Sequence, residues 1–333
     1  MKITLIMIIG LCLAACGSST QNADGGQDGS DAGADLGPAV LPTECLADPD
    51  CDVVFVSAHR GLCGSEPENT LAAFLECEQK GVPMLEIDTR ETSDGFVVVM
   101  HDGDVIRTTD GETRFPGRTD VDQLTLAEFQ TLVIDHDSCV DDPDANPDRC
   151  RPPTFAQVLE RTGPQTVLDV DFKSGFATKL AGLVKDAGVV ERILFFDSNL
   201  DNLRAYLTVL PQGIVMPRTE DAAAVDNLLF TGNEDLGLLW AHTDPWFAAE
   251  VKVRMLAAGV RQYFNGWDGT DPADIWILAA MAAEEAEDYE LQAEYEEKAR
   301  LAINKMINDG ARALGSDFGP DYVQILYPDG FGR

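Results

Sequence analysis

The sequence predicts an α/β fold of the (β/α)8 barrel class, and two observations support this prediction. Short apolar runs alternate with helical segments along most of the chain, a pattern typical of parallel βα units. Eight runs remain when a hairpin arm after the second is set aside, and eight parallel strands close a barrel of about 250 residues. The runs are Val53–Ala58, Met84–Asp88, Val167–Phe172, Ile193–Asp197, Gly213–Met216, Leu236–Trp240, Val260–Phe264 and Ala313–Phe318.

The segments between these runs predict helices and one long loop. Apolar residues recur at helical spacing over Glu68–Lys80, and Gly81 ends the pattern. Residues 124–133 predict a second helix. The segment Asp135–Pro153 is rich in Asp and Pro, which predicts a surface loop. Residues Asp271–Asp309 form one long helical pattern before the last strand, strongly acidic in its middle. A solvated helix is the simplest interpretation of this pattern, and a lid or a partner-binding face is the alternative.

The composition limits the classes of function. The 333 residues are 45% hydrophobic, which is enough for a large core. Lys and Arg number 24 and Asp and Glu 58, so the formal net charge is −34. Nucleic acids and anionic membrane surfaces repel such a charge, so we expect neither as a docking surface. An anionic substrate would need local cations to hold it.

The N-terminus predicts export and lipid anchoring. Met1 and Lys2 precede a short apolar run that ends in small residues, as in a secretory signal peptide of residues 1–15. The stretch before Cys16 resembles the lipobox of bacterial lipoproteins, in which the cysteine carries the lipid. Residues 16–44 then predict a disordered acidic tether, and residues 45–333 the folded domain. We expect a lipid-anchored protein of the cell envelope; a soluble secreted protein is the alternative.

Cysteine use agrees with an exported protein. Of eight cysteines, Cys12 would leave with the signal and Cys16 would carry lipid, which leaves six. An even number in an oxidising compartment predicts disulfides, although the sequence permits many connectivities. A zinc site is the rival interpretation, but no Cys-x-x-Cys pair is present. Proximity in the sequence favours Cys45 with Cys51, Cys63 with Cys77 and Cys139 with Cys150.

A predicted hairpin brings a histidine and two carboxylates together. The turn Ser93-Asp94-Gly95 separates two apolar runs, and Asp-Gly at such a place is a strong hairpin signal. A turn centred on Asp94 and Gly95 would place His101 opposite Asp88. Glu86 lies two residues before Asp88 and so points to the same side. The alternative is that the acids are solvent-facing and the histidine is structural.

These groups suit metal-assisted acid–base chemistry. Two carboxylates at alternate strand positions can share a hard divalent cation, and an imidazole can move a proton near neutral pH. A second cluster follows on the strand Val167–Phe172, where Asp169, Asp171 and Lys173 alternate and share one face.

An ordered set of short motifs resembles the glycerophosphodiester phosphodiesterase family. The resemblance is dense over residues 53–133 and patchy to about residue 320. Its motifs are HRG at His59–Gly61, PENT at Pro67–Thr70, E-x-D at Glu86–Asp88, HD at His101-Asp102 and RTTDG at Arg107–Gly111.

The resemblance implies hydrolysis of glycerophosphodiesters to an alcohol and sn-glycerol 3-phosphate. It implies acid–base roles for His59 and His101, and phosphate contacts for Arg60 and Lys173. The implied ligands of a divalent cation, Ca or Mg by ligand hardness, are Glu86, Asp88 and Asp171. Asp171 stands where the family usually has Glu, so the distance to the metal and the preferred metal are open. Residues 260–269 stand in place of the family's terminal strand motif and keep an Asn (Asn265) and a nearby Trp (Trp267) as possible pocket residues.

Two other functions stay open at this level. The sphingomyelinase D enzymes resemble this barrel and use Asp on the strand that carries Asp171, so a phospholipase D-like activity on sphingomyelin or lysophospholipids is the first alternative. A non-catalytic surface binding module is the second, and the intact pair His59 and His101 is an argument against it.

Overall fold

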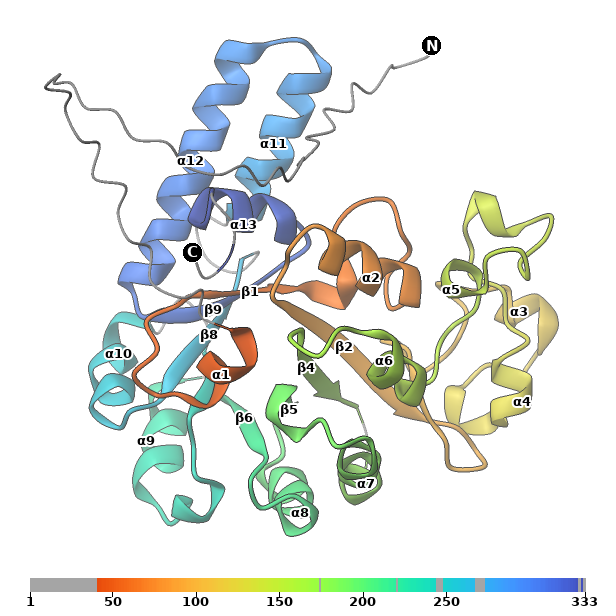
Figure 1. Ribbon diagram of the computed structural model, residues 1–333, viewed down its shortest axis with the longest axis horizontal. Helices are drawn as coiled ribbons and strands as arrows, with labels where there is room; N and C mark the ends of the chain where they lie inside the picture. Colours follow the sequence, from red (N-terminus) through yellow and green to blue (C-terminus); the bar gives the residue numbers. More distant parts are fainter. Residues whose placement is uncertain are drawn as a thin grey trace, which may run out of the picture. The chain divides into compact units, whose positions relative to one another are not determined.

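Eight parallel strands form a closed barrel in the computed structural model, which describes residues 41–173, 175–219, 221–243, 248–266, 273–328 and 331 (Figure 1). The barrel closes because β1 pairs with β2 on one side and with β9 on the other. The predicted barrel is therefore confirmed. Its strands are β1 (Phe55–Ala58), β2 (Met84–Glu91), β4 (Val167–Phe172), β5 (Ile193–Asp197), β6 (Ile214–Thr219), β7 (Trp240–Thr243), β8 (Arg261–Asn265) and β9 (Ala311–Ser316).

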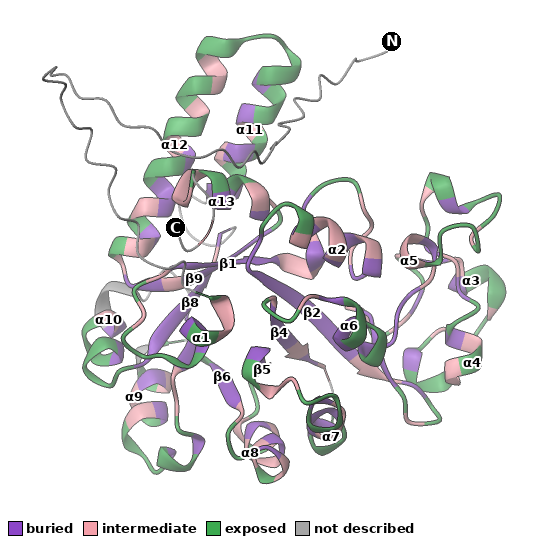
Figure 2. Ribbon diagram, viewed as in Figure 1, coloured by how far each residue is buried: buried purple, intermediate pink, exposed green. Residues whose placement is uncertain are grey.

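Amphipathic helices cover the outside of the barrel, with buried strands inside and exposed outer helix faces (Figure 2). In α7, Leu180 and Val184 are buried, whereas Lys179 and Lys185 are exposed. This spacing places one helix face against the strands. The covering helices are α2 (Leu71–Gln79), α6 (Phe155–Arg161), α7 (Ala177–Ala187), α8 (Leu200–Val209), α9 (Ala222–Phe230), α10 (Ala248–Ala257) and α13 (Gly319–Leu326).

Shorter helices fill the connections. The helix predicted at 68–80 is α2, but the one predicted at 124–133 is only the short α4. The predicted loop 135–153 also contains two short helical turns. The short elements are η1 (His59–Gly61), α3 (Gly111–Arg114), η2 (Val121–Gln123), α4 (Leu126–Phe129), η3 (Asp137–Cys139), α5 (Pro147–Cys150), η4 (Val190–Arg192) and η5 (Glu234–Leu236).

The helix α1 (Pro42–Ala47) closes the N-terminal mouth of the barrel. Trp240 at the start of β7 donates from Nε1 to the Leu46 carbonyl at 3.0 Å, and Arg261 at the start of β8 donates to the Cys45 carbonyl at 2.7 Å. Both carbonyls belong to α1, so buried donors fix the helix in place. With this end filled, the C-terminal ends of the strands are left for chemistry.

The strand β7 shows where the strand prediction was wrong. Leu236 ends the helical turn η5, and Gly237 follows at φ 52°. The strand β7 begins only at Trp240 and continues to Thr243. Leu236 is buried in the layer between helices and sheet. The apolar run at this point therefore reflects the burial of its side chains and does not indicate an extended backbone. The other strands overlap their predicted ranges.

The hairpin forms, but its predicted register was wrong by one residue. The strand β3 (Val97–Val99) pairs antiparallel with β2, with Thr89 opposite Val99. Thr92 N donates to the Phe96 carbonyl at 2.9 Å, so the turn has three residues instead of two. Gly95 takes φ 85° to close it, a conformation that favours glycine. Met100, whose N donates to the Asp88 carbonyl at 3.1 Å, therefore takes the place predicted for His101.

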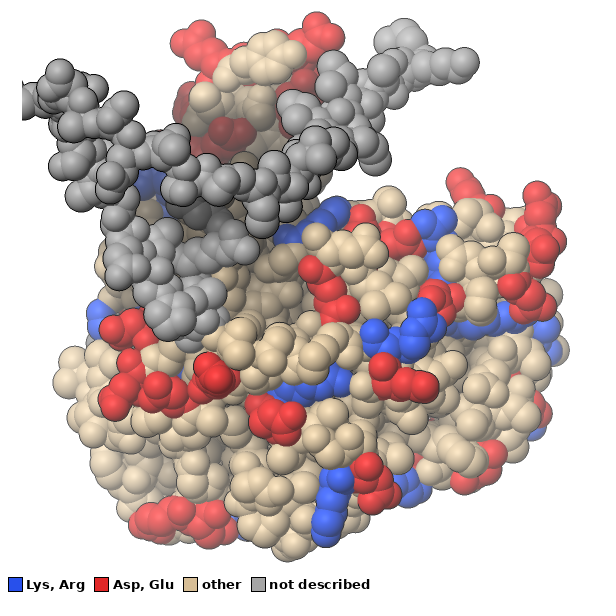
Figure 3. Space-filling model, viewed as in Figure 1, with Lys and Arg blue, Asp and Glu red and all other residues tan. Residues whose placement is uncertain are grey.

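The segment predicted as one helix at 271–309 contains two helices, α11 (Ala273–Glu285) and α12 (Tyr289–Asn308), which fold back on each other (Figure 1). Glu287 has φ 58°, and the Asp288 side chain caps α12 by accepting from Leu291 N at 3.1 Å. Periodicity alone cannot reveal this break because both helices continue the same acidic pattern. Acidic side chains gather at the tip of this helical hairpin (Figure 3).

All three predicted disulfides form, namely Cys45–Cys51, Cys63–Cys77 and Cys139–Cys150. Among the helices that the structure describes, none has the length and apolar character needed to cross a membrane. Residues 1–40 lie outside the described part of the chain, so the signal peptide, the lipidation of Cys16 and the tether over residues 16–40 stay predictions. The last residues of the predicted tether, 42–44, are helical instead, because α1 begins at Pro42, three residues before the predicted start of the folded domain at residue 45.

Candidate active site

One cavity of about 320 Å³ at the C-terminal ends of the strands collects the predicted site residues. His101 lines it although the hairpin register differs, because the chain leaves β3 after Val99 and turns toward the barrel mouth. Trp267 lies outside the described residues. The predicted residues that line the cavity are His59, Arg60, Glu86, Asp88, His101, Asp171, Lys173 and Asn265.

The loop after β1 holds Arg60 in a strained conformation. Arg60 has φ 53°, which costs about 1–3 kcal/mol for a residue with a Cβ. This conformation allows a hydrogen bond from its backbone N to Glu86 Oε2 at 2.7 Å. Gly61 follows at φ 71°, and a Cβ there would lie 2.6 Å from the Phe74 ring, so the HRG sequence fits this turn sterically.

His59 and His101 are each hydrogen-bonded to an aspartate. His101 Nδ1 lies 2.7 Å from Asp102 Oδ1, and His59 Nδ1 lies 2.7 Å from Asp317 Oδ1. A carboxylate at Nδ1 favours a proton on that nitrogen, which leaves Nε2 to exchange protons with a substrate. Sequence reasoning missed Asp317, because it follows β9 at a separation of 258 residues from His59.

A chain of ion pairs connects His101 to Arg60. Arg107 donates from Nε to Asp102 at 2.5 Å and from Nη2 to Glu68 at 2.7 Å. Glu68 also accepts from Arg60 Nη1 at 3.2 Å. Burial alone would raise the pKa of Asp102, but hydrogen bonds from Arg107 and His101 outweigh it and lower that pKa. Residues of the PENT and RTTDG motifs thus hold the side chains of the HD and HRG motifs in position through ion pairs.

Three carboxylates form the centre of the site. Ligand oxygens of Glu86, Asp88 and Asp171 all lie within 4.8 Å of one another. The sheet produces this arrangement, because Asp88 on β2 pairs directly with Asp171 on β4 and Glu86 lies two residues back on the same face. Asp171 therefore reaches the cluster although its side chain is shorter than Glu. Lys173 Nζ lies 2.6 Å from Asp171 Oδ2 and 3.0 Å from Asp88 Oδ1.

The electrostatics of this cluster fit a hard divalent cation. Burial and the neighbouring carboxylates raise the pKa of Glu86 well above its usual value, and burial raises that of Asp171. The pKa of Asp88 is lowered: burial opposes this, but the Lys173 ammonium and the Asn69 amide, 2.8 Å away, outweigh burial. The Lys173 ammonium and the Arg60 guanidinium, whose Nε lies 3.7 Å from Asp88 Oδ2, are two cations beside three carboxylates, of which Glu86 and Asp88 are buried. An oxygen-only donor set with excess negative charge suits Ca or Mg.

We call this side of the pocket, formed by the ends of β1, β2 and β4, the ionic wall. Asp169 belongs to it as well: it is buried, and burial together with Asp171 raises its pKa well above its usual value. It was predicted to share the face of Asp171 and Lys173, and it does line the pocket.

The opposite side, formed by β5 to β8, was largely missed by sequence reasoning. Its rings pack together: the His242 ring stacks on Tyr263 with centroids 5.2 Å apart and is tilted against Phe196 with centroids 5.3 Å apart. His242 Nε2 lies 3.4 Å from Asn265 Oδ1. Burial and the Arg218 guanidinium lower the pKa of His242 to about 4, so it is neutral at neutral pH. We call Phe196, His242, Tyr263 and Asn265 the aromatic wall.

A signal for His242 was present in the sequence. The chain has only four histidines, and this one follows an apolar run, as His59 and His101 do. The wrong range predicted for β7 obscured this signal, because a strand that ends at Trp240 leaves His242 in a loop.

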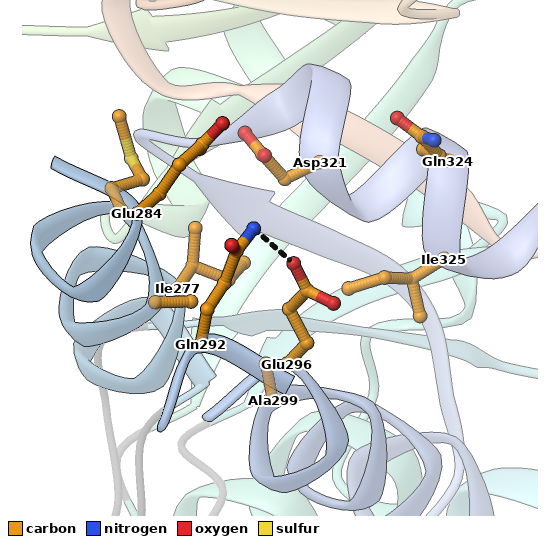
Figure 4. A pocket seen from close by; sticks show the side chains of 10 residues that line it. Ile277, Glu284, Gln292, Glu296, Ala299, Asp321, Gln324 and Ile325 are labelled. Atoms are coloured by element: carbon orange, nitrogen blue, oxygen red, sulfur yellow. Dashed lines mark hydrogen bonds between the residues drawn. The ribbon is translucent and has the colours of Figure 1, made fainter. Parts of the chain in front are cut away.

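A separate cavity, of about 240 Å³, lies between α11, α12 and α13 (Figure 4). Gln292 on α12 donates to Glu296 at 2.8 Å across one turn. Among the described residues that line it there is no histidine, lysine or arginine, and none is shared with the catalytic cavity. The described linings of the two cavities are therefore distinct.

A sequence model described as the glycerophosphoryl diester phosphodiesterase family matches residues 59–250 of the chain. The chain belongs to this family. The match begins at His59 and ends within α10, so it contains the residues of the ionic wall. The strands β8 and β9, with Asn265 and the helical hairpin, lie beyond the matched segment.

Curated relatives align with part of the chain. A glycerophosphodiester phosphodiesterase of Caldanaerobacter subterraneus subsp. tengcongensis is 32% identical over 163 residues, which is 47% of this chain and 63% of that protein. Glycerophosphodiester phosphodiesterase 1 of Rattus norvegicus is 49% identical over 63 residues, 19% of each chain. In these alignments the chain covers less than two thirds of each relative.

Solved structures share the fold over most of the chain. A putative glycerophosphoryl diester phosphodiesterase from Silicibacter pomeroyi has a TM-score of 0.63 at 17% identity, covering 88% of this chain and 99% of that one. An Oleispira antarctica phosphodiesterase, in complex with the product sn-glycerol-3-phosphate, has a TM-score of 0.58 at 21% identity, covering 83% and 98%. At these identities the likeness establishes the barrel fold.

Proposed function

We propose that this protein hydrolyses glycerophosphodiesters to an alcohol and sn-glycerol 3-phosphate. The observation that carries the proposal is the placement of two histidines, each backed by an aspartate, around one carboxylate cluster in a single cavity. Family membership supports it, as do the names of the relatives and the product complex of the Oleispira antarctica protein.

The ionic wall would bind the phosphate. Glu86, Asp88 and Asp171 would hold a divalent cation, Ca or Mg, which when bound would polarise the phosphoryl oxygens. Lys173 and Arg60 are the nearest cations of this wall, and both are oriented by carboxylates of the cluster or beside it. They would neutralise the non-bridging phosphate oxygens as charge develops on them.

The two histidines would move the protons. One accepts the proton of the attacking water through Nε2 as the water oxygen bonds to phosphorus. The other donates a proton to the departing oxygen as the phosphorus–oxygen bond to the alcohol breaks. Asp102 and Asp317 orient the rings and stabilise each imidazolium when it forms.

We also propose that the protein is an exported lipoprotein anchored through Cys16. The signal-like N-terminus and the lipobox support this, and three disulfides agree with an oxidising compartment. In a bacterial host, Cys16→Ser should move the protein from the membrane fraction to the soluble fraction. Continued membrane association of the variant would contradict the anchor.

Phosphorus NMR of the products tests the activity. Glycerophosphocholine should yield glycerol 3-phosphate, and the reaction should stop when a chelator removes the metal and resume when Ca or Mg is restored. Sphingomyelin in a parallel sample tests the phospholipase D-like alternative, whose product would be ceramide phosphate. Turnover of sphingomyelin alone, or of neither diester under any metal, would overturn the proposal.

A further inference from the structure

Another cavity continues from the catalytic one past Lys173. It has a volume of about 340 Å³ and shares four lining residues with the catalytic cavity, namely Asp171, Lys173, Phe196 and Arg218. The two spaces therefore meet at the residues that would hold the phosphate. A phosphodiester has two organic groups on its phosphate, so a substrate with glycerol in the catalytic cavity would direct its other alcohol into this adjoining space. We call it the headgroup cavity.

The described part of the headgroup cavity carries polar donors. Ser198 and Asn202 lie on the loop after β5 and on α8, and Arg218 lies exposed at the end of β6. Hydroxyl, amide and guanidinium groups all bond to hydroxyl oxygens. The cavity can therefore form hydrogen bonds to an alcohol that has several hydroxyl groups.

The aromatic side chains of this cavity do not form a cage. Its described lining includes Phe172 and Phe196. Phe172 is buried with its ring centroid 4.5 Å from that of Phe176 and 5.3 Å from that of Phe195, so it packs in the layer between sheet and helices. Phe196 is then the one ring left to face a ligand, and one ring does not enclose a quaternary ammonium group as an aromatic cage does.

The charges of the described lining offer a cation no excess of anions. Two acids, Asp171 and Asp197, are balanced by two cations, Lys173 and Arg218. Lys173 Nζ lies 2.6 Å from Asp171 Oδ2, and Asp197 is buried and accepts from Asn199 N and from Asn202 Nδ2, both at 2.7 Å. A choline or ethanolamine ammonium would share this space with the Arg218 guanidinium, while both acids already accept hydrogen bonds.

We infer that the headgroup cavity binds the leaving alcohol and selects an uncharged polyol, such as glycerol, over a cationic amino alcohol. The inference rests on the proposed function, since it names the headgroup class of the same reaction. Arg218 is the residue that sets the preference, by repelling ammonium and donating to hydroxyls.

Substrate comparison tests the preference. The wild-type protein, with its metal, should have a kcat/KM for glycerophosphoglycerol about tenfold or more above that for glycerophosphocholine. Arg218→Gln should bring the two values together, and Arg218→Glu should reverse their order by attracting the ammonium. Arg254→Gln is the matched control, because this substitution removes the same charge at a position that lines neither cavity. Arg254 is exposed on α10 and pairs with Asp226.

Two results would overturn the inference. One is a wild-type protein that hydrolyses both diesters equally well. The other is an Arg218→Gln variant that loses the same factor on both, which would make Arg218 a phosphate contact.

Failure of the proposed function is a separate result, namely no release of glycerol 3-phosphate from either diester. In that case, equilibrium binding of the two intact diesters by NMR still tests the cavity. Tighter binding of glycerophosphoglycerol, abolished by Arg218→Glu, supports it, and equal or tighter binding of glycerophosphocholine refutes it.

Discussion

The two sides of the catalytic cavity are encoded differently in the chain. The ionic wall comes from short contiguous motifs, each placed at a strand end with its own support: Arg60 contacts Glu86 and Glu68, and Arg107 connects Glu68 to Asp102. The aromatic wall uses single residues from β5 to β8. Their neighbours lie on adjacent strands, so no local pattern identifies them. The ionic wall is therefore encoded locally in the sequence, apart from the partner Asp317 of His59, whereas the aromatic wall is distributed along it.

The largest expected effect breaks the ionic wall at its histidines. His59→Ala or His101→Ala should lower kcat by about 100- to 10,000-fold, because a positioned acid or base is removed. Steady-state kinetics with phosphorus NMR measures this, and circular dichroism checks the fold. His136→Ala, which removes a half-buried histidine that contacts Ser138 outside the cavity, is the control. A loss of kcat of only a few-fold would contradict the acid–base roles of His59 and His101.

The next effect concerns the metal and pH. The raised pKa of Glu86 and of Asp171 means that these groups hold protons in the folded protein at pH values where the unfolded chain has released them. Without metal, their contribution to stability is therefore lost as pH rises from the ordinary carboxyl range through the raised values. The lowered pKa of Asp88 acts oppositely, but below its usual value of 3.8.

A bound divalent cation should reverse this trend, because it competes with those protons more successfully at higher pH. At an ion concentration 100 times Kd the stabilisation would be about 2.7 kcal/mol. Thermal unfolding with chelator and with Ca or Mg, at pH 5 and pH 8, measures it. Asp171→Ala should weaken the metal effect, and Asp171→Glu should keep it. An unfolding temperature that does not change with Ca or Mg at either pH value would show that the cluster binds no such ion.

A smaller effect is expected from the support of the ionic wall. Arg107→Gln should lower kcat about 10- to 100-fold with little change in KM, because Asp102 and Glu68 lose their common partner. It should also raise the pKa of Asp102, which Arg107 lowers, and so move the acidic limb of the pH–rate profile to higher pH. Arg114→Gln is the control, because Arg114 is the last residue of α3 and its ion pair in the described structure is with Asp110. An unchanged pH profile would contradict a positioning role.

The smallest effect is expected at the tip of the helical hairpin. Replacing Glu284, Glu285 and Glu287 with Gln and Asp288 with Asn should change kcat/KM by less than about twofold. The 13-residue helix α11 places this tip about 20 Å from the end that Asp274 anchors to Ser316. That distance exceeds the screening length of about 8 Å in physiological salt. A large, salt-sensitive change on anionic diesters would restore the lid hypothesis.

The barrel and most of the ionic wall were predictable because strand ends in a parallel barrel converge, whatever the details of each loop. Three features were not predictable, each for a physical reason. The register at His101 depends on whether the turn has two or three residues, which Gly95 decides through its backbone. The break at Glu287 leaves no mark on the helical period. Asp317 reaches His59 only through strand pairing across the whole chain.

The hydrogen bond between His59 and Asp317 also has a consequence for synthesis. Asp317 follows β9, whose pairing with β1 closes the barrel, and 258 residues separate the two partners. A growing chain that has not yet made β9 carries the HRG and PENT motifs, but His59 still lacks its carboxylate. The His59–Asp317 pair can form only after β9 has been made and has paired with β1, so a partial product that ends before β9 carries the motifs of the site without the carboxylate at His59.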